Sequence, residues 1–233
     1  MVYIPFASLL GLQAALEPLV FKQPVPETAL ITGVDYVDPR PGGGSLLDHD
    51  SGSGLGEPLN VIISGNSDPW VLADGGFVHF ANALGFGIEC FGAHLGAPQT
   101  ANLGDGHGWV NQTFELRKDY GNPDIGSCWE SLVGGNHLRL WHQNGPKANT
   151  GALFLAVSEE KNLSNKHTVA TNGYNAGRDS LVKNALALKK YKGVKYNTVA
   201  QRITGLIPPG SDGINHRIPT DGVVVLLTVK IVK

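Results

Sequence analysis

Apolar residues recur along the chain in two patterns, one typical of strands and one typical of helices. Six segments carry continuous or alternating apolar runs that predict strands or extended structure: residues 59–64, 88–95, 111–120, 137–143, 152–160 and 191–207. The valine-rich run over residues 222–233 predicts a long final strand, buried on both faces near the middle of a sheet.

Two segments have the 3.6-residue spacing of amphipathic helices. The first covers residues 68–84, where Asp68 can cap the helix and Pro69 can take its first position. The second covers residues 174–188. Their predicted apolar faces consist of Phe77, Phe80, Ala81 and Leu84 in the first, and Leu181, Val182, Ala185, Leu186 and Leu188 in the second. Strands and helices in this order predict an α+β domain over residues 59–233, with a mixed or mostly antiparallel sheet and two main helices.

The N-terminal part of the chain has a different character. Prolines interrupt residues 1–58, which predicts an extended arm rather than helices. Within it, residues 41–56 are rich in glycine and serine, and we expect a flexible loop there. The start of the chain has a short apolar run without a basic leader, so a retained arm and a degenerate signal peptide both stay open.

Composition narrows the class of protein. Charged residues make up 16% of the 233 positions and glycines number 31, which suits a domain with many tight turns. The net charge of −2 gives no support to nucleic-acid binding. Residues 1–136 hold four basic and fifteen acidic residues, whereas residues 137–233 hold fourteen and five. This asymmetry fits two halves that neutralise each other, or copies that meet through opposite charges.

Cysteines and sequons point to a secreted protein. Cys90 and Cys128 are the only cysteines and predict one disulfide. Asn111 and Asn162 each begin an N-x-Ser/Thr sequon, so both are predicted glycosylation sites. We expect a location outside the cell or in the cell wall, and no run is long enough to predict a membrane span.

Four blocks of sequence resemble the LssY C-terminal domain: EPLNVIISG, HLRLWHQ, GALFLAVSEE and GYNAGRDSLVKNAL. That family shows an opening strand with Asn-Val, an H-x-R-x-W strand, a GA-rich strand and an R-D-x-L-V helix. The resemblance covers residues 57 to about 188, and the whole chain is similar to small secreted fungal proteins built around this domain. No established activity comes with the family, and the region from Cys90 to Cys128 departs from its pattern.

The H-x-R-x-W strand is the first candidate for chemistry. Period-two alternation places His137, Arg139 and Trp141 on one face. Together with Arg178 and Asp179, this face could bind a phosphate or carboxylate, because arginine binds such groups in a bidentate manner. The alternative, which we favour, is that the arginines form structural ion pairs and the tryptophan packs against the sheet.

A glycine-rich loop supplies the second candidate. His94, Asp105 and His107 are of the residue types that bind zinc or manganese, but their spacing matches no ligand signature, so no cofactor is predicted. The segment GSCW coincides with the nucleophile segment of papain-like proteases. A disulfide at Cys128 would remove the thiolate that such chemistry needs.

These patterns predict a secreted glycoprotein that acts by binding or by self-assembly rather than by catalysis. The partner expected from the sequence is a second copy of the chain, joined through the N-terminal arm and the oppositely charged halves, with the ligand unspecified. The alternative is a hydrolase that acts on phosphoryl or similar anionic substrates through the His/Arg face.

Overall fold

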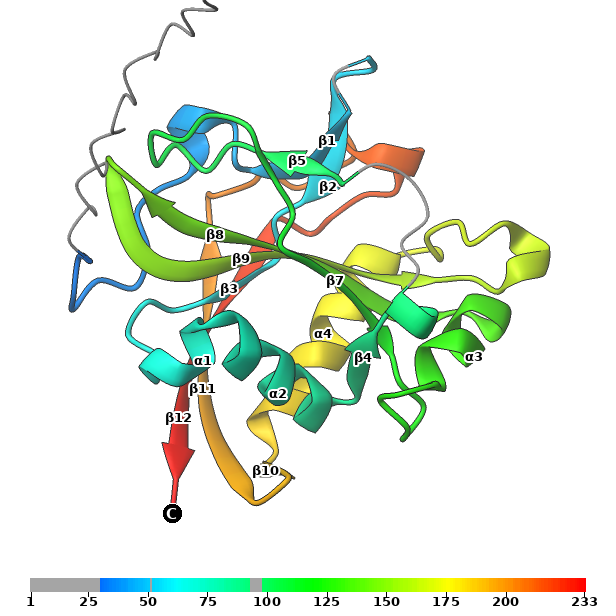
Figure 1. The fold of residues 1–233 in the computed structure, drawn as a ribbon. Helices are drawn as coiled ribbons and strands as arrows, with labels where there is room; N and C mark the ends of the chain where they lie inside the picture. The colour runs from blue at the N-terminus through cyan, green and yellow to red at the C-terminus, as the bar shows by residue number, and fades with distance from the viewer. Residues whose placement is uncertain (1–29, 51, 93–97) are drawn as a thin grey trace, which may run out of the picture.

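A computed structural model describes residues 30–50, 52–92 and 98–233. Its centre is a curled sheet of eight strands, antiparallel throughout except where β12 pairs with β3 (Figure 1). In spatial order these strands are β10 (Lys189–Tyr191), β11 (Val194–Thr204), β12 (Val223–Val232), β3 (Val61–Ile63), β9 (Ala148–Glu160), β8 (Gly135–Gly145), β7 (Phe114–Lys118) and β4 (Phe86–Ile88). The final strand is interior, as the valine-rich run predicts.

Two small sheets and several helices surround the large sheet. The small sheets pair β1 (Leu46–Asp50) with β2 (Leu55–Pro58), and β5 (Thr100–Ala101) with β6 (Val110–Asn111). The α-helices are α1 (Pro69–Leu72), α2 (Asp74–Leu84), α3 (Gly126–Val133) and α4 (Gly173–Leu186), and the 3-10 turns are η1 (Arg40–Gly42), η2 (Cys90–Gly92), η3 (Leu163–Asn165) and η4 (Asn215–Arg217). The predicted α+β class and mostly antiparallel sheet are confirmed, and α2 and α4 are the two longest helices. Residues 1–29 of the arm predicted over residues 1–58 lie outside the described residues.

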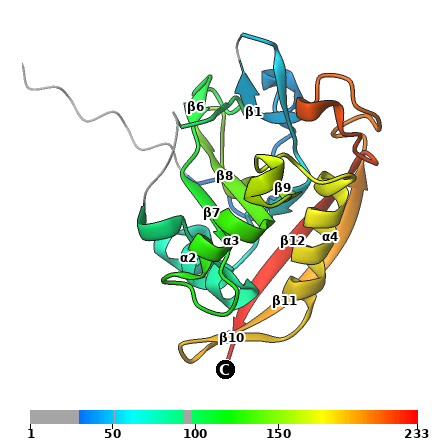
Figure 2. The same cartoon turned by 90° about the vertical axis from the view of Figure 1, so that its right-hand side faces the viewer.

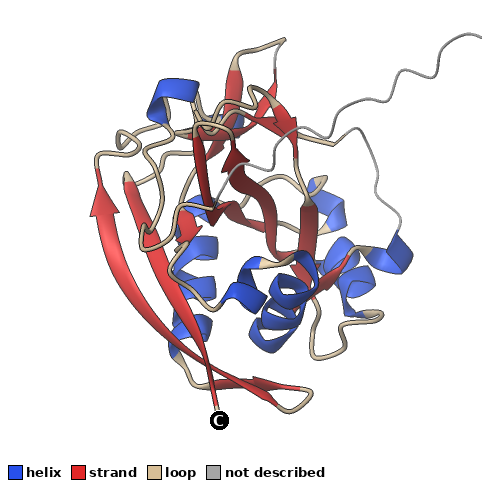
Figure 3. Cartoon of the chain, turned by 60° about the vertical axis from the view of Figure 1, so that its left-hand side comes forward, coloured by secondary structure: helices blue, strands red, loops and turns tan. Residues whose placement is uncertain are grey.

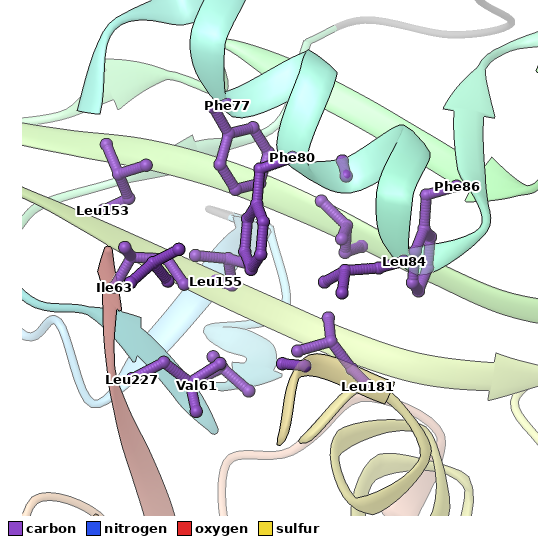
Figure 4. Packing of buried hydrophobic residues seen from close by; sticks show 14 of the residues in the cluster. Val61, Ile63, Phe77, Phe80, Leu84, Phe86, Leu153, Leu155, Leu181 and Leu227 are labelled. Atoms are coloured by element: carbon purple, nitrogen blue, oxygen red, sulfur yellow. The ribbon is translucent and has the colours of Figure 1, made fainter. Parts of the chain in front are cut away.

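One face of the sheet holds the main hydrophobic core. Phe77, Phe80 and Leu84 project from α2 onto Leu153 and Leu155 of β9 (Figure 4). All of these side chains are buried, as are Leu116 and Leu138 on the neighbouring strands. The predicted apolar face of the first helix is therefore confirmed, and burial of these aromatic and aliphatic side chains stabilises the fold by about 2 kcal/mol each.

Helix α4 closes a gap in the sheet. Strand β3 is only three residues long, so β9 and β12 continue beyond it without a strand between them. At this point the Asn60 side chain donates to the carbonyl oxygens of Val157 and Tyr174, linking β9 to α4. A β-carbon at Gly177 would come within 2.7 Å of the Ser158 backbone, so glycine lets the helix lie directly against the strand. Figure 2 shows α4 beside β12 and β11.

The predicted helix over residues 68–84 is broken. Asp68 caps α1 by accepting a hydrogen bond from the Trp70 amide, and Pro69 opens it, as expected. Ala73 then takes an extended conformation, and α2 begins at the next residue. A β-carbon at Gly76 would overlap the Trp70 carbonyl oxygen, so the glycine permits the tight join.

Three expectations about local structure are wrong. Residues 88–95 do not form one strand, because the chain turns into η2 at Cys90, where the disulfide joins it to α3. Residues 41–56 are not a flexible loop: they contain η1 and most of the β1–β2 hairpin, whose Leu47 is fully buried. Helix α3 lies where the sequence predicts no helix. Its outward face is apolar and its inward face carries Glu130, which reverses the pattern by which a surface helix is predicted.

The predicted disulfide is present. Cys90 and Cys128 are bonded, with their Cα atoms 4.6 Å apart, and the bond ties η2 to the first turn of α3. No helix within residues 30–233, the gaps at 51 and 93–97 excepted, is both long and apolar enough to cross a lipid bilayer.

Candidate functional site

A network of buried charges occupies the face of β7, β8 and β9 opposite the main core. In the register of the two strands, Glu115 of β7 lies across from Arg139 of β8, and Arg117 of β7 lies across from His137. Ser158 of β9 lies across from His137 in turn. Because side chains alternate between the faces of a strand, this polar set shares its strands with the buried leucines of the core.

Arg139 is the centre of one half of this network. Its Nη1 donates to Asp48 Oδ2 at 3.2 Å and to Glu57 Oε2 at 3.3 Å, both from the β1–β2 hairpin. Its Nε donates to Glu115 Oε2 at 3.1 Å. Burial alone would lower the pKa of Arg139, but the carboxylates of Glu57, Glu115 and Asp48 offset this and raise it. Arg139 therefore anchors the hairpin to the sheet.

Arg117 is the centre of the other half. Its Nη2 donates to Glu115 Oε1 at 2.5 Å, so Glu115 bridges both arginines. Its Nη1 donates to Glu130 Oε2 at 3.0 Å and to Glu160 Oε2 at 3.1 Å. Glu89 Oε1 lies 3.7 Å from Nε. Four carboxylates thus surround one guanidinium.

His137 lies between the two halves and is fully buried. Arg139 Nη1 lies 3.2 Å from Nε2, and a guanidinium can only donate, so Nε2 is the acceptor. The proton is therefore on Nδ1, which lies 3.2 Å from Ser158 Oγ and 3.3 Å from Glu160 Oε1. Burial, then Arg139 and Arg117, hold the pKa of His137 well below its usual value, so the ring is neutral.

Burial raises the pKa of three carboxyl groups of the network. Burial raises the pKa of Glu57 to about 7, although Arg139 opposes the shift. Burial also raises the pKa of Asp48 and of Glu160, against the pull of Arg139 and Arg117 respectively. Acids outnumber arginines here, so the surplus carboxylates take up protons more readily than exposed ones do.

Arg178 and Asp179 belong to a different group of contacts. Arg178 is 1% exposed and donates to Asp179 Oδ1 at 2.9 Å, to Asp221 Oδ1 at 2.6 Å and to the Val223 carbonyl oxygen at 2.9 Å. These bonds fix α4 to the start of β12. Among the hydrogen bonds and ion pairs of the described residues, none joins Arg178 to His137 or Arg139. Each arginine instead forms ion pairs with carboxylates, which is the alternative that we favour from the sequence.

The glycine-rich loop holds Asp105 in a structural role. Its Oδ2 accepts from the amides of Asn144 and Gly145, and its Oδ1 accepts from the amide of His107. His107 Nδ1 is 3.9 Å away and half exposed. Asp105 therefore organises the turn between β8 and β9, and His94 lies outside the described residues.

A pocket opens next to the Arg117 half of the network. Its volume is about 510 Å³, and it is lined mostly by apolar atoms of Cys90, Leu132 and Leu163 among others, with Glu89, Arg117 and His167 as the charged or titratable part. A larger pocket of about 580 Å³ between the ends of α2 and α4 contains none of the candidate residues.

Leu132 and Leu163, which line this pocket, belong to a set of exposed apolar side chains on α3 and on β4, η2 and η3, which contact it. We call them the α3 surface, and they are Ile88, Phe91, Ile125, Trp129, Leu132, Val133 and Leu163. Phe91 is 83% exposed and Trp129 is 57% exposed. On α3 the spacing of Ile125, Trp129 and Leu132 gives the helix an apolar stripe that faces solvent. Clustered exposed apolar residues of this size mark binding surfaces.

The two sequons differ in their surroundings. Asn111 is exposed at the end of the short β6 strand. Asn162 is partly buried and caps η3, and its side-chain oxygen accepts from Ser164 and Asn165. A glycan is sterically easier to place on Asn111.

Sequence reasoning missed most of the network. Asp48, Glu57 and Glu130 fall in segments predicted as loop or left without a helix, and Glu160 and His167 follow no known spacing. One signal for the network was present in the sequence. Glu115 and Arg117 occupy alternate positions of a predicted strand, so their opposite charges lie on one face.

Comparisons of the chain with protein-family models, with curated proteins and with solved structures found no match. The resemblance to the LssY C-terminal domain therefore stays a prediction, and function is argued from the site alone.

Proposed function

We propose that this chain is a secreted protein that binds a small molecule with an apolar body at the α3 surface. The observation that carries the proposal is the pocket of about 510 Å³ that Leu132 and Leu163 of that surface line. Its size is in the range of small-molecule sites, and its walls are apolar with a few polar groups at one side.

Binding is favoured over hydrolysis by the partners of the candidate catalytic residues. His137 and Arg139 are buried and hydrogen-bonded to carboxylates or to each other, and Arg178 is occupied by Asp179 and Asp221. A hydrolase that uses these residues on an anionic substrate would need them to face one open pocket, and surplus carboxylates beside them repel anions.

A neutral apolar fluorescent dye, Nile red, tests the binding site. We expect it to bind with an increase in fluorescence, and we expect Leu163→Ser or Leu132→Ser to weaken binding about tenfold, since each removes a pocket-lining side chain worth roughly 1.5 kcal/mol of burial. Trp109→Ser is the matched control, because Trp109 is equally exposed but stacks on His49 away from the α3 surface. Dye binding unchanged in both site variants would refute the proposal.

Secretion is supported by the disulfide, which persists in oxidising compartments. Material from the natural source should carry glycan on Asn111, and Asn162 should be modified to a smaller extent because it caps η3. Intact mass before and after glycosidase treatment, with Asn111→Gln and Asn162→Gln as separate variants, measures each site. Equal masses in every sample would argue against secretion through a glycosylating pathway.

Self-assembly is the second candidate, and an open sheet edge favours it. Strand β10 covers β11 only up to Tyr196, and within the described residues no strand pairs with that edge over residues 197–204 (Figure 3, the outer long strand on the left). Such an edge can pair with the same edge of a second copy. Light scattering of the variants Val199→Lys and Leu188→Lys, both at exposed positions, tests this pairing. Only Val199→Lys should lower the molar mass of the assembly in solution. A monomeric parent protein would exclude the candidate.

A further inference from the structure

Three metal-ligating side chains from separate elements meet behind the pocket. Glu130 comes from α3, Glu160 from the end of β9, and His167 follows η3. One ligand atom from each lies within 4.8 Å of the others. We propose that Glu130, Glu160 and His167 bind a divalent transition-metal ion, with Zn²⁺ or Mn²⁺ as the best match to two carboxylates and one imidazole.

Glu130 provides the strongest observation. The residue is 0% exposed, and its Oε2 accepts a hydrogen bond from Arg117 at 3.0 Å. Its Oε1 is buried and has no hydrogen-bond partner among the described residues. A buried carboxylate oxygen without a partner is strongly unfavourable. A bound cation would supply the missing interaction.

His167 is prepared as a ligand in a second way. Its Nε2 lies at hydrogen-bond distance from the Ser131 carbonyl oxygen, which can only accept, so Nε2 carries the proton. The lone pair is then on Nδ1, which is buried without a hydrogen bond and lies 3.6 Å from Glu160 Oε2. Metal-bound histidines commonly donate their other ring nitrogen to a backbone carbonyl in this manner. A cation between these two acceptors would interact favourably with both.

The charge of the surroundings also favours a dication. Glu89, Glu115, Glu130 and Glu160 all lie within 4 Å of Arg117, which provides one positive charge. Glu115 is shared with Arg139, which also pairs with the carboxylates of Asp48 and Glu57. A divalent ion would balance the carboxylates that Arg117 leaves uncompensated.

The elements around the site hold the ligands with limited freedom. Arg117 hydrogen-bonds to both glutamates, and the Cys90–Cys128 disulfide fixes α3 two residues before Glu130. Ligands at about 2.1 Å from a tetrahedral ion are roughly 3.4 Å apart, so small side-chain rotations suffice. Since His167 lines the pocket, a fourth position would face it and be open to water.

Titration of the full chain tests this proposal. Protein stripped with a chelator is titrated calorimetrically with ZnCl₂ and MnCl₂, and with MgCl₂ and CaCl₂ for comparison. We expect one equivalent of Zn²⁺ or Mn²⁺ to bind more tightly than Mg²⁺ or Ca²⁺. Co²⁺ provides a spectroscopic check, because its visible absorption reports coordination by nitrogen and oxygen ligands.

Matched variants locate the site. Glu130→Gln and His167→Gln should each weaken binding at least about tenfold. The controls Glu159→Gln and His107→Gln change exposed or half-exposed residues of the same types and should bind like the parent. Circular dichroism confirms folding, and His167→Gln, at a partly exposed position, serves if Glu130→Gln unfolds.

The result that overturns the proposal is either no binding of Zn²⁺ or Mn²⁺, or binding that Glu130→Gln and His167→Gln leave unchanged. The inference is independent of the proposed ligand. Leu132→Ser should lower dye binding and leave metal binding intact, whereas Glu130→Gln should do the reverse, so each claim can fail alone.

Discussion

Strands β7, β8 and β9 present two faces that differ in chemistry: one packs in the main core, whereas the other carries charges beside a second apolar cluster that includes Trp141 and Phe154. On one face Leu116, Leu138 and Val157 pack beneath α2 with no polar partner to satisfy. On the other, the adjacent residues Arg117, His137 and Ser158 join a buried network of charges. The first face is held by non-directional burial, which tolerates exchange between similar apolar side chains. The second is held by specific partners from β1, β2 and α3, and the loss of one leaves the others unpaired.

This difference also explains what the sequence could predict. The leucines at alternate positions of residues 137–143 and 152–160 are enough to place the strands and their buried face, because that face requires only periodicity. The charged face depends on Asp48 and Glu57, which lie some 80–90 positions before Arg139, and no local pattern encodes that pairing. Helix α3 could not be predicted because its burial is the reverse of the usual pattern. Its apolar stripe is exposed, whereas Glu130 is buried.

The charge asymmetry of the chain has a partly internal explanation. Asp48, Glu57 and Glu115 from the acidic half all pair with Arg139 of the basic half within one molecule. These pairs support mutual neutralisation of the two halves, so the asymmetry by itself gives less reason to expect contacts between copies.

The largest effect is expected at Arg139. Replacing it by Met leaves the buried carboxylates of Asp48 and Glu57 without their cation, while Glu115 keeps Arg117, and should lower the free energy of unfolding by about 3–5 kcal/mol at neutral pH. Leu138→Ala, one residue away on the other face, should lose about 2–5 kcal/mol through the cavity it leaves. Urea denaturation at two pH values separates the two causes.

The loss in Arg139→Met should shrink at pH 5, because Glu57, whose pKa burial raises to about 7, is protonated there. The loss in Leu138→Ala should not depend on pH. Equal pH profiles for both variants would contradict the division between the two faces.

The next effect concerns the disulfide, which supports the charged face only. Replacing Cys90 and Cys128 by Ser should lower stability by about 3–4 kcal/mol for a closed loop of 38 residues. Amide exchange should quicken in α3 and around Arg117 and stay slow in α2, whose contacts lie on the other face. Uniform loss of protection over both faces would show that they are not independent.

A smaller effect is expected from Glu57. Its folded-state pKa of about 7 exceeds the ordinary value of 4.5, so between these values the folded state holds a proton that the unfolded state has released. The contribution of this group is therefore complete below pH 4.5 and is lost as pH rises through 7. From pH 5.5 to 8 the loss should be about 1–2 kcal/mol, and Glu57→Gln should abolish it. A Glu57→Gln protein with the parent pH dependence would assign the titration to another group.

The smallest effect comes from a direct comparison of neighbours on β9. Val157→Ala removes two buried methyl groups from the core face and should cost about 1.5–3 kcal/mol. Ser158→Ala removes a hydrogen-bond partner of His137 Nδ1, but Glu160 Oε1 remains 3.3 Å from the same nitrogen and can accept instead. We therefore expect a loss of about 0.5–1.5 kcal/mol, the usual net value of one hydrogen bond.

Thermal unfolding of both variants at one pH gives the comparison. A cost at Ser158 above that at Val157 would mean that the network cannot replace even one of its partners, and the charged face would then be the more rigid of the two.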